Sequence, residues 1–183
     1  MQLVVYLNAA MELAAKNHSR KEIVPAAVLY YHVADPMVER VGEAISPEEL
    51  NAQLLQELKT KGVVNAEFGV PEKLDTSQTT KSDVIPVEYK KDGSFTAGSS
   101  VMGSTDLKTV SQYVSHKIKE IGSNILAGDI AVTPYERGME NACTYCSYAG
   151  ICGYDSRIAG FQHRKLDDIG KDEVMEQMKQ EIQ

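Results

Sequence analysis

The sequence predicts a mixed α/β (α+β) fold in which helices pack on a small mixed sheet. Stretches with the apolar periodicity of helices alternate with short runs of β-branched and aromatic residues, which is typical of helices layered on a sheet. The chain has 183 residues, of which 43% are hydrophobic and 25% are charged. A chain of this size and composition can bury one sizeable core, so we expect one domain over residues 1–183.

Residues 2–16 predict the first helix, because apolar side chains recur at steps of three and four. No Ser, Thr, Asp or Asn precedes this helix to cap its first amides, so we expect the chain to start inside a domain. The predicted apolar face consists of Leu3, Val4, Leu7, Ala10, Met11 and Ala14.

Three further helices are predicted. The segment Ser46-Pro47-Glu48-Glu49 combines a cap, a proline at the first helical position and a capping-box glutamate. Ser104 or Thr105 caps a long helix that Gly128 closes. A charged terminal helix starts at about Asp172. The apolar stripe of the long helix consists of Leu107, Val110, Val114, Ile118, Ile121 and Ile125.

Strand signals are shorter. Ala26–Val33 is an apolar and aromatic run ended by Asp35-Pro36, which indicates a buried strand. Val84–Tyr89 and the residues from Phe95 onward flank Lys91-Asp92-Gly93, whose Asp-Gly pair predicts a hairpin.

Two stretches carry weaker signals. Residues 62–83 contain scattered glycine, proline and polar residues, so we interpret them as a connecting excursion. Residues 130–135 are expected to be extended.

Charge and hydropathy restrict the classes of function. The formal net charge of −7 argues against general attraction to phosphate, so any contact with nucleic acid must be local. No segment approaches the roughly 20 apolar residues that a membrane helix requires. The N-terminus also lacks the basic residues followed by a short apolar stretch that mark a secretory signal peptide. We expect a cytoplasmic protein without a membrane partner.

Cys143, Cys146 and Cys152 form a C-x2-C-x5-C cluster, which lets a tight turn aim three thiols at one point. Three cysteines so close together, with no distant partner, do not indicate a disulfide framework. Thiolates suit zinc or an iron–sulfur cluster, and each of these takes four protein ligands. The fourth ligand is either a histidine such as His163 or a cysteine that this chain does not contain.

Gln2 and Tyr6 are four residues apart and therefore lie on one helix face. Together with the cysteine pattern, which continues to Asp155, this Q-L-x-x-Y segment resembles the C-terminal part of the nuclease domain of the AddB/RexB subunit of bacterial ATP-dependent helicase–nucleases. The resemblance covers nearly the whole chain. It includes Val28–Val33 before Asp35-Pro36, Lys61–Val64, Lys91–Phe95 and Gly128–Tyr135.

The resemblance implies a fragment of a restriction-endonuclease-like domain of the RecB-like PD-(D/E)XK superfamily. In such nucleases an Asp, an acidic residue and a Lys hold Mg²⁺ and activate water, and these residues should precede Gln2. The resemblance implies that Gln2 binds or orients a group near the metal site, and that Tyr6 supports Gln2 in this role. The implied parent is an ATP-dependent DNA exonuclease that processes double-strand breaks with an AddA/RexA-like helicase–nuclease subunit, and the isolated fragment should be inactive.

Asp83, Glu88 and Lys90 imitate a D…E-x-K arrangement inside the chain. Their acids are five residues apart and follow the Gln2–Tyr6 helix, which reverses the order in the family. We interpret this segment as a hairpin arm without a catalytic role.

For the cysteines, the resemblance implies a four-cysteine [4Fe–4S] cluster whose first ligand lies far upstream. Cys143, Cys146 and Cys152 match its last three ligands, within a knuckle over residues 136–166 that would pin the C-terminal segment onto the nuclease core. Without the first cysteine, the fragment is not expected to hold an intact cluster.

Basic residues around the knuckle could contact DNA phosphates, although solvated surface or salt bridges explain them equally well. The candidates are Arg137, Arg157 and Arg164, with His163 among them.

Two other interpretations remain open. The chain could be a zinc-stapled binding module without catalytic ancestry, whose metal is completed by His163. It could also be another RecB-like or CRISPR-associated iron–sulfur nuclease, although the long insertion between Tyr6 and Cys143 resembles AddB/RexB more closely.

Overall fold

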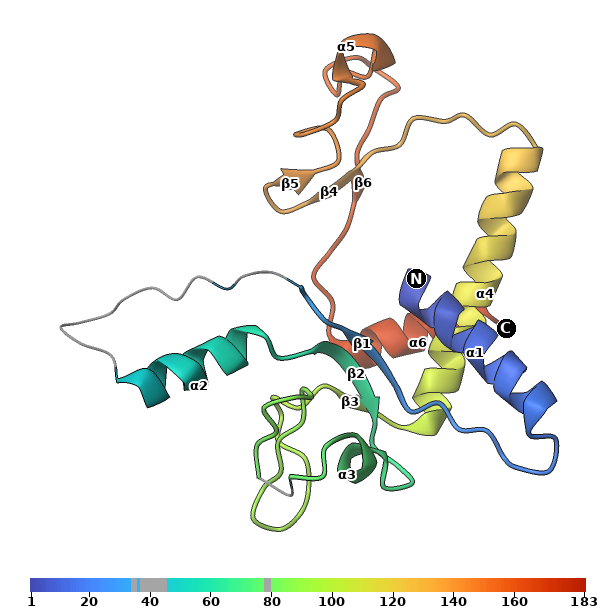
Figure 1. Ribbon diagram of the computed structural model, residues 1–183. Helices are drawn as coiled ribbons and strands as arrows, with labels where there is room; N and C mark the ends of the chain where they lie inside the picture. Colours follow the sequence, from blue (N-terminus) through green and yellow to red (C-terminus); the bar gives the residue numbers. More distant parts are fainter. Residues whose placement is uncertain (34–35, 37–45, 78–79) are drawn as a thin grey trace. The chain divides into compact units, whose positions relative to one another are not determined.

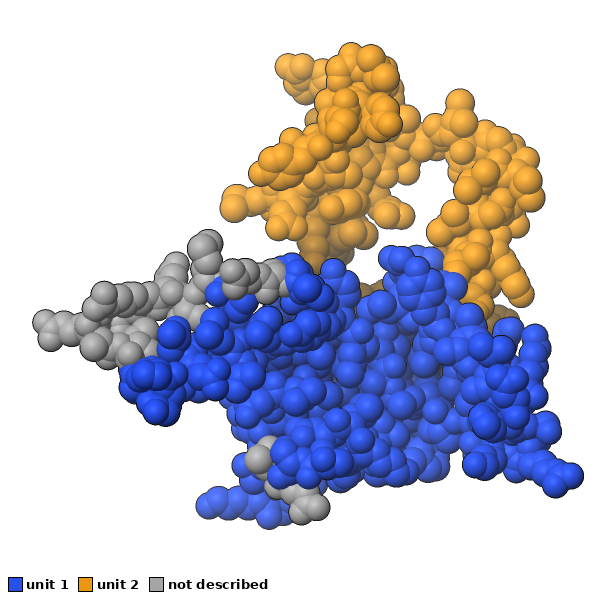
Figure 2. All heavy atoms as spheres, viewed as in Figure 1, with its two compact units in different colours: residues 1–114 blue, residues 115–183 orange. Residues whose placement is uncertain are grey.

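The computed structural model describes residues 1–33, 36, 46–77 and 80–183. The chain divides into two compact units, residues 1–114 and 115–183, which Figure 2 shows in different colours. The division falls inside a helix, and the expected knuckle over residues 136–166 lies within the second unit. The mixed α/β fold is confirmed, since helices accompany small sheets in both units (Figure 1).

The sheet of the first unit has three strands in the order β1-β2-β3. β2 (Lys61–Asn65) lies in the centre, antiparallel to β1 (Ala27–Tyr30) and parallel to β3 (Val101–Met102). The sheet is therefore mixed, as expected. The β-branched pair Val63 and Val64 suits this central position, where both backbone edges are hydrogen-bonded.

The core of the first unit forms against β2. Its buried side chains are Val64, Val70, Ile85 and Val87. Val70 begins the short helix α3 (Val70–Leu74), whereas Ile85 and Val87 come from the loop that follows. Five partly buried hydrophobic side chains pack against this cluster: Ala27, Leu29, Tyr89, Phe95 and Val101.

Helix α1 (Gln2–Asn17) confirms the first predicted helix, and its N-cap Met1 makes no side-chain capping bond. Val4, Leu7, Met11 and Ala14 of the predicted apolar face are half-buried. The prediction is wrong for Leu3 and Ala10, which are exposed because the buried face turns toward Val5 and Asn8.

Helix α2 (Pro47–Glu57) begins as predicted. The Ser46 hydroxyl accepts a bond from the Glu49 amide at 3.2 Å, and the Glu49 carboxylate accepts one from the Ser46 amide at 3.0 Å. This reciprocal pair confirms the capping box. Leu50 and Leu55 are nevertheless exposed.

Helix α4 (Ser104–Leu126) confirms the long helix, and Gly128 follows its end with a φ of +77°. Ser104 and Thr105 lie inside the helix rather than ahead of it, so the predicted cap position is wrong. The amide of Leu107 donates to the Gly103 carbonyl at 3.0 Å, which moves the start of the helix upstream. Leu107 and Val114 are buried, whereas the later stripe residues Ile118, Ile121 and Ile125 are exposed.

The predicted buried strand over 26–33 is shorter and less buried than expected. β1 ends at Tyr30, and Tyr30, Tyr31 and Val33 are exposed because β1 lies at an edge of the sheet. Asp35, expected to end the strand, lies outside the described residues.

The interpretation of residues 62–83 as a connecting excursion is wrong for its first part. That stretch contains the central strand β2 and helix α3. Gly62, which looked like a breaker, is required inside the strand. It has a φ of +144°, and a Cβ there would stand 2.0 Å from the Val28 carbonyl oxygen across the β1–β2 pair.

The predicted hairpin is confirmed at its turn. Gly93 has a φ of +80°, its amide donates to the Lys90 carbonyl at 3.0 Å, and the Lys90 amide donates to Ser94 at 2.7 Å. Among the described residues, one isolated bridge joins its arms, Tyr89 with Phe95, and another joins Glu88 of the first arm to Lys81.

The second unit contains a small sheet in the order β5-β4-β6. β4 (Tyr135–Arg137) pairs antiparallel with β5 (Glu140–Asn141) and parallel with β6 (Arg164–Lys165). Residues 130–134 carry no regular structure, and only Tyr135 of the expected extended stretch is in a strand. The short helix α5 (Ala149–Cys152) lies between β5 and β6 in sequence (Figure 1).

Helix α6 (Lys171–Glu181) confirms the charged terminal helix. Its Glu181 carboxylate pairs with Lys117 of α4 at 2.5 Å, and Lys117 also pairs with Glu120 at 2.9 Å. None of the helices in the described part of the chain has the length and apolar character needed to cross a bilayer.

Candidate functional site

Gln2 and Tyr6 form a polar pair on the first turns of α1. The Gln2 amide nitrogen donates to the Tyr6 hydroxyl at 2.8 Å, as their four-residue spacing allows. Both side chains are exposed, with 59% of Tyr6 accessible. The pair is therefore ordered locally and available to a further group.

Asn8 fixes the opposite side of α1. Its side-chain oxygen accepts a hydrogen bond from the Ser111 hydroxyl at 2.6 Å, and its amide nitrogen reaches the Ser111 carbonyl at 3.4 Å. Both residues belong to the first unit, so these bonds hold α1 to the early turns of α4. These bonds fix the rotation of α1 relative to the early turns of α4, and so they fix the direction of the face that carries Gln2 and Tyr6.

The cysteine knuckle is built on the small sheet of the second unit. Asn141, at the end of β5, accepts bonds from the Cys143 amide at 2.9 Å and the Thr144 hydroxyl at 3.1 Å. The Cys146 amide then donates to the Cys143 carbonyl at 3.3 Å. These bonds fold the chain into the tight turn that the C-x2-C spacing predicts.

The second part of the knuckle brings Cys152 to the cavity that Cys143 and Cys146 also line. The Cys152 amide donates to Tyr148 at 2.9 Å in α5, and Gly153 leaves that helix with a φ of +70°. All three cysteines are free thiols and line one cavity of about 360 Å³. Other lining residues include Tyr154, Asp155 and His163.

The donor set fits a soft metal or an iron–sulfur cluster in kind, because three thiols share one cavity. It supplies three of the four cysteine ligands that such a cluster takes. Over residues 1–33, 36, 46–77 and 80–183, no three His, Cys, Asp or Glu side chains are close enough together to hold a metal ion.

His163, the candidate fourth ligand for zinc, lines the cysteine cavity, and one of its two ring nitrogens pairs with a carboxylate. Its Nδ1 lies 3.3 Å from the Glu136 carboxylate, and its ring stands edge-on to Tyr154 with the ring centroids 5.1 Å apart. A carboxylate on one imidazole nitrogen orients the ring and leaves the other nitrogen for a ligand role.

Tyr154 is a cavity residue that the sequence interpretation missed. Its ring also stands edge-on to Phe161, at 5.3 Å between centroids. Its hydroxyl is buried, with no hydrogen-bond partner among the described residues. Burial raises the pKa of Tyr154, and the nearby Cys143 and Glu136 add to the effect. A buried donor without a partner, in a cavity lined by thiols, suits a site that receives a further group.

Asn141 is the other missed residue. An Asn two positions before a turn is a recognisable signal, because its side chain bonds backbone amides further along. Tyr154 offers no comparable signal, since its burial depends on Phe161 and His163.

Two of the three candidate DNA-binding arginines form ion pairs. Arg157 contacts Asp155 with Nε at 2.9 Å and a terminal nitrogen at 2.6 Å, and this holds the pKa of Asp155 down to about 2. Arg137 Nε bonds Asp168 at 2.8 Å. Arg164 lies exposed in β6. The salt-bridge explanation thus accounts for Arg137 and Arg157 in this chain.

Asp83, Glu88 and Lys90 occupy the loop that supplies core residues. Asp83 accepts a bond from Gln56 at 3.0 Å, and the Glu88 backbone exchanges bonds with the Ser99 hydroxyl at 2.9 and 2.8 Å. These contacts support the loop, as expected of a hairpin arm.

Comparison with known proteins gives a consistent family. The family profile described as the PD-(D/E)XK nuclease superfamily matches residues 1–153, which include Gln2, Tyr6 and all three cysteines.

Three relatives are each described as the B subunit of an ATP-dependent helicase/deoxyribonuclease. The protein from Lachnoclostridium phytofermentans is 40% identical over 99% of this chain, and the one from Desulforamulus reducens is 38% identical over 92%. The one from Alkaliphilus metalliredigens is 32% identical over the whole chain. This chain spans 16%, 14% and 16% of the length of these relatives, respectively. The chain therefore belongs to the PD-(D/E)XK nuclease superfamily, and over nearly its whole length it is similar to subunits of the AddB/RexB type.

Proposed function

We propose that this chain is the C-terminal part of the nuclease domain of a Mg²⁺-dependent DNA exonuclease subunit. The exposed Gln2–Tyr6 pair at the start of α1 carries the proposal. We match this pair to the Gln/Tyr helix of the nuclease pattern, which follows the catalytic residues in the family. The family match over residues 1–153 supports it.

Phosphodiester hydrolysis needs a hard metal ion, since carboxylate oxygens hold Mg²⁺ and the metal activates water and offsets charge on phosphate. We assign the required Asp, acidic residue and Lys to residues outside this chain. Asp83, Glu88 and Lys90 serve the loop instead. The chain alone is then inactive, and Gln2 orients a group at the metal site while Tyr6 fixes Gln2.

The cysteine cavity has a structural role in this proposal. Cys143, Cys146 and Cys152 would hold three corners of a [4Fe–4S] cluster, and a fourth cysteine from outside the chain would hold the last. When bound, the cluster closes a long loop and so restricts the unfolded chain. The chain's own residues preform the knuckle through Asn141 and Gly153.

The relatives are described as subunits of an ATP-dependent helicase/deoxyribonuclease. We infer that the whole protein works with an AddA/RexA-like subunit on linear DNA ends, in the cytoplasm, during recombinational repair of double-strand breaks. Arg164 is the basic knuckle residue best placed to contact phosphate, because Arg137 and Arg157 are paired with Asp168 and Asp155.

The test uses the longer subunit with Gln2→Ala and, separately, Tyr6→Phe. Degradation of linear duplex DNA in Mg²⁺ should fall strongly for Gln2→Ala and less for Tyr6→Phe, which removes the hydroxyl that accepts from Gln2. Gln53→Ala, at an exposed position of α2, is the matched control. Full cleavage by Gln2→Ala would overturn the assignment.

A second candidate is a zinc-stapled binding module, favoured by the presence of His163 in the same cavity as the three thiols. Colourless protein with stoichiometric zinc, lost on His163→Ala, would support it. Visible charge-transfer absorption that depends on the cysteines but not on His163 would reject it.

A further inference from the structure

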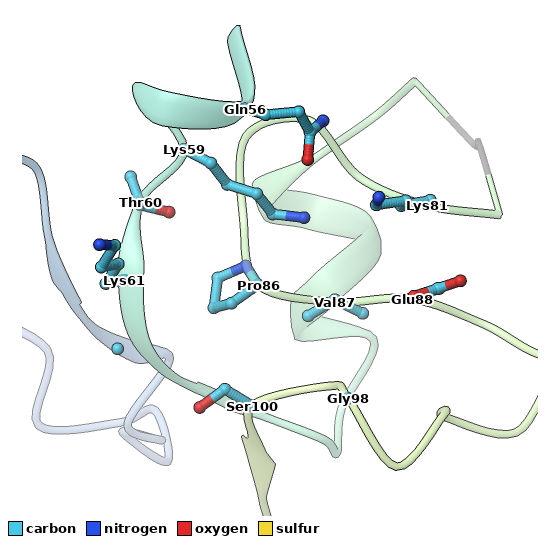
Figure 3. Close-up of a pocket in the computed structure, with 11 residues that line it drawn as sticks. Gln56, Lys59, Thr60, Lys61, Lys81, Pro86, Val87, Glu88, Gly98 and Ser100 are labelled. Carbon is cyan, nitrogen blue, oxygen red and sulfur yellow. The ribbon is translucent and has the colours of Figure 1, made fainter. Parts of the chain in front are cut away.

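A second cavity, of about 470 Å³, lies in the first unit between the end of α2, the start of β2 and the loop over residues 81–100. Its volume lies within the range of roughly 300–1,000 Å³ that ligand sites usually have. Figure 3 shows the side chain of Lys59 running across this cavity above Pro86, with Lys81 on the far side. We call it the lysine groove, and its charged lining residues are Lys59, Lys61, Lys81 and Glu88.

The charge of the groove is opposite to that of the chain. Three lysines face one glutamate there, whereas the whole protein carries a formal net charge of −7. In such a protein, a local cluster of lysines marks a surface for an anionic ligand.

The groove is framed by backbone and side-chain bonds. The Thr60 amide donates to Val84 at 3.1 Å, and the Ser100 amide donates to Pro86 at 2.8 Å. The Lys59 ammonium donates to the Ser82 carbonyl at 2.5 Å. An ammonium has three donors, and the bond to Ser82 holds Lys59 in position across the groove, where Asp75 also interacts with it electrostatically.

We propose that the lysine groove binds the sugar–phosphate backbone of the DNA substrate through Lys59, Lys61 and Lys81. The inference rests on the proposed nuclease function and adds to it a substrate-binding site in the first unit. Lysine contacts phosphate as a point charge, and such contacts position a nucleic acid without reading its sequence.

The lining favours backbone contact over base contact. Among the described residues that line the groove, none is aromatic, so no ring is offered for a base to stack on. Pro86, Val87 and Gly98 also line the groove, and their side chains offer no group that could hydrogen-bond to a base edge. Binding should therefore be independent of sequence and sensitive to salt.

The experiment measures binding of fluorescent oligonucleotides to the 183-residue chain by anisotropy, with EDTA present so that hydrolysis plays no part. The groove variant carries Lys59→Met, Lys61→Ala and Lys81→Ala, and the first change keeps the apolar stem of Lys59. The control variant removes the same charge at exposed lysines that do not line the groove, with Lys16→Ala, Lys90→Ala and Lys91→Ala. Single-stranded and duplex oligonucleotides show which form the groove takes.

Loss of three phosphate contacts should flatten the dependence of log Kobs on log salt by about 2 for a single strand. Between about 50 and 200 mM salt, the unchanged chain should then lose roughly 20-fold more affinity than the groove variant. The control variant should keep a steeper salt dependence than the groove variant, and Glu88→Gln should strengthen binding because it removes a carboxylate that lines the groove.

Three results would overturn the groove: equal salt slopes in the groove and control variants, no binding by the unchanged chain, or equal competition by polyglutamate, which would indicate an acidic protein partner. If the groove variant unfolds, Lys61→Ala with Lys81→Ala answers the question, because both side chains are exposed. The same three substitutions can be made in the longer subunit. If its cleavage activity and its DNA affinity then stay unchanged, the groove proposal is rejected and the nuclease proposal is not. Groove-dependent binding without cleavage in that subunit would reject only the nuclease proposal.

Discussion

The side-chain amide of Asn65, at the end of the central strand β2, donates a hydrogen bond to the Ser104 hydroxyl at 3.0 Å, in the first turn of α4. The same amide donates to the Pro25 carbonyl at 2.7 Å, and the Asn65 oxygen accepts from the Glu67 amide at 2.9 Å. Asn65 is fully buried. One polar side chain thus joins the segment before β1, the end of β2 and the start of α4.

Asn65→Leu should destabilise the chain strongly. The substitution removes the bonds that Asn65 makes to the partly buried Pro25 carbonyl and to the Glu67 amide, at a cost of about 1 kcal/mol for each bond. Urea denaturation followed by circular dichroism measures the loss, with exposed Asn51→Leu in α2 as the control. A loss no larger than that of Asn51→Leu would contradict the role assigned to Asn65.

Gly62→Ala and Gly122→Ala should have opposite effects. A Cβ at residue 62 would meet the Val28 carbonyl oxygen at 2.0 Å, so we expect a loss of about 2–3 kcal/mol from strain and a disrupted strand pair. Gly122 lies inside α4 with open space around it, and alanine there should stabilise by about 0.5–1 kcal/mol. Thermal unfolding distinguishes the two, and equal shifts of Tm would refute the close-approach argument.

Tyr89 makes the stability of the first unit sensitive to alkaline pH. Burial and its hydrogen bond to Glu72, 2.8 Å from the hydroxyl, raise the pKa of Tyr89 from 10.0 to about 12. The stabilising contribution is fully present below pH 10 and is lost as pH rises from about 10 through 12, because the unfolded chain releases the proton first. Unfolding free energies measured across this window should fall more steeply for the unchanged chain than for Tyr89→Phe. Parallel pH profiles would argue against the linkage.

Tyr154→Phe should stabilise the metal-free chain, which raises the midpoint of its thermal unfolding. The hydroxyl is buried with no partner in the described structure, so removing it relieves a desolvation cost and keeps the ring contacts with Phe161 and His163. Tyr148→Phe at an exposed position is the control. Destabilisation by Tyr154→Phe, but not by Tyr148→Phe, would show that the hydroxyl has a partner.

Sequence patterns predicted the helices well because their signals are local. The capping box at Ser46 and Glu49 lies within four residues, and the periodicity of α4 repeats over several turns. Burial was harder to predict from the same stripe. Val114 is buried and Ile125 is exposed, although both fit the pattern, because burial depends on what lies opposite each turn.

The central strand was missed for a physical reason. β2 is short, and Gly62 inside it looks like a breaker until the approach of the Val28 carbonyl is known. The buried role of Asn65 was equally hidden, since its partners Pro25 and Ser104 are about 40 residues away on each side.

For the candidate site, the spacing of Cys143, Cys146 and Cys152 predicted a shared location. The structure places all three around one cavity, although in the described part of the chain they do not come close enough together to hold a metal ion. The ion pairs of Arg137 and Arg157 depend on carboxylates whose positions the sequence does not reveal. The lysine groove was missed for a similar reason. Lys59 and Lys81 line the same cavity only because the loop that contains Lys81 folds back toward β2.

The most direct measurement of the central claim is Mg²⁺-dependent degradation of linear DNA by this 183-residue chain, alongside its Glu88→Ala variant. If the catalytic carboxylates lie outside the chain, neither protein should release nucleotides above the background without protein. Robust degradation by the unchanged chain, abolished by Glu88→Ala, would contradict the account and move the active site to the loop that carries Asp83 and Glu88.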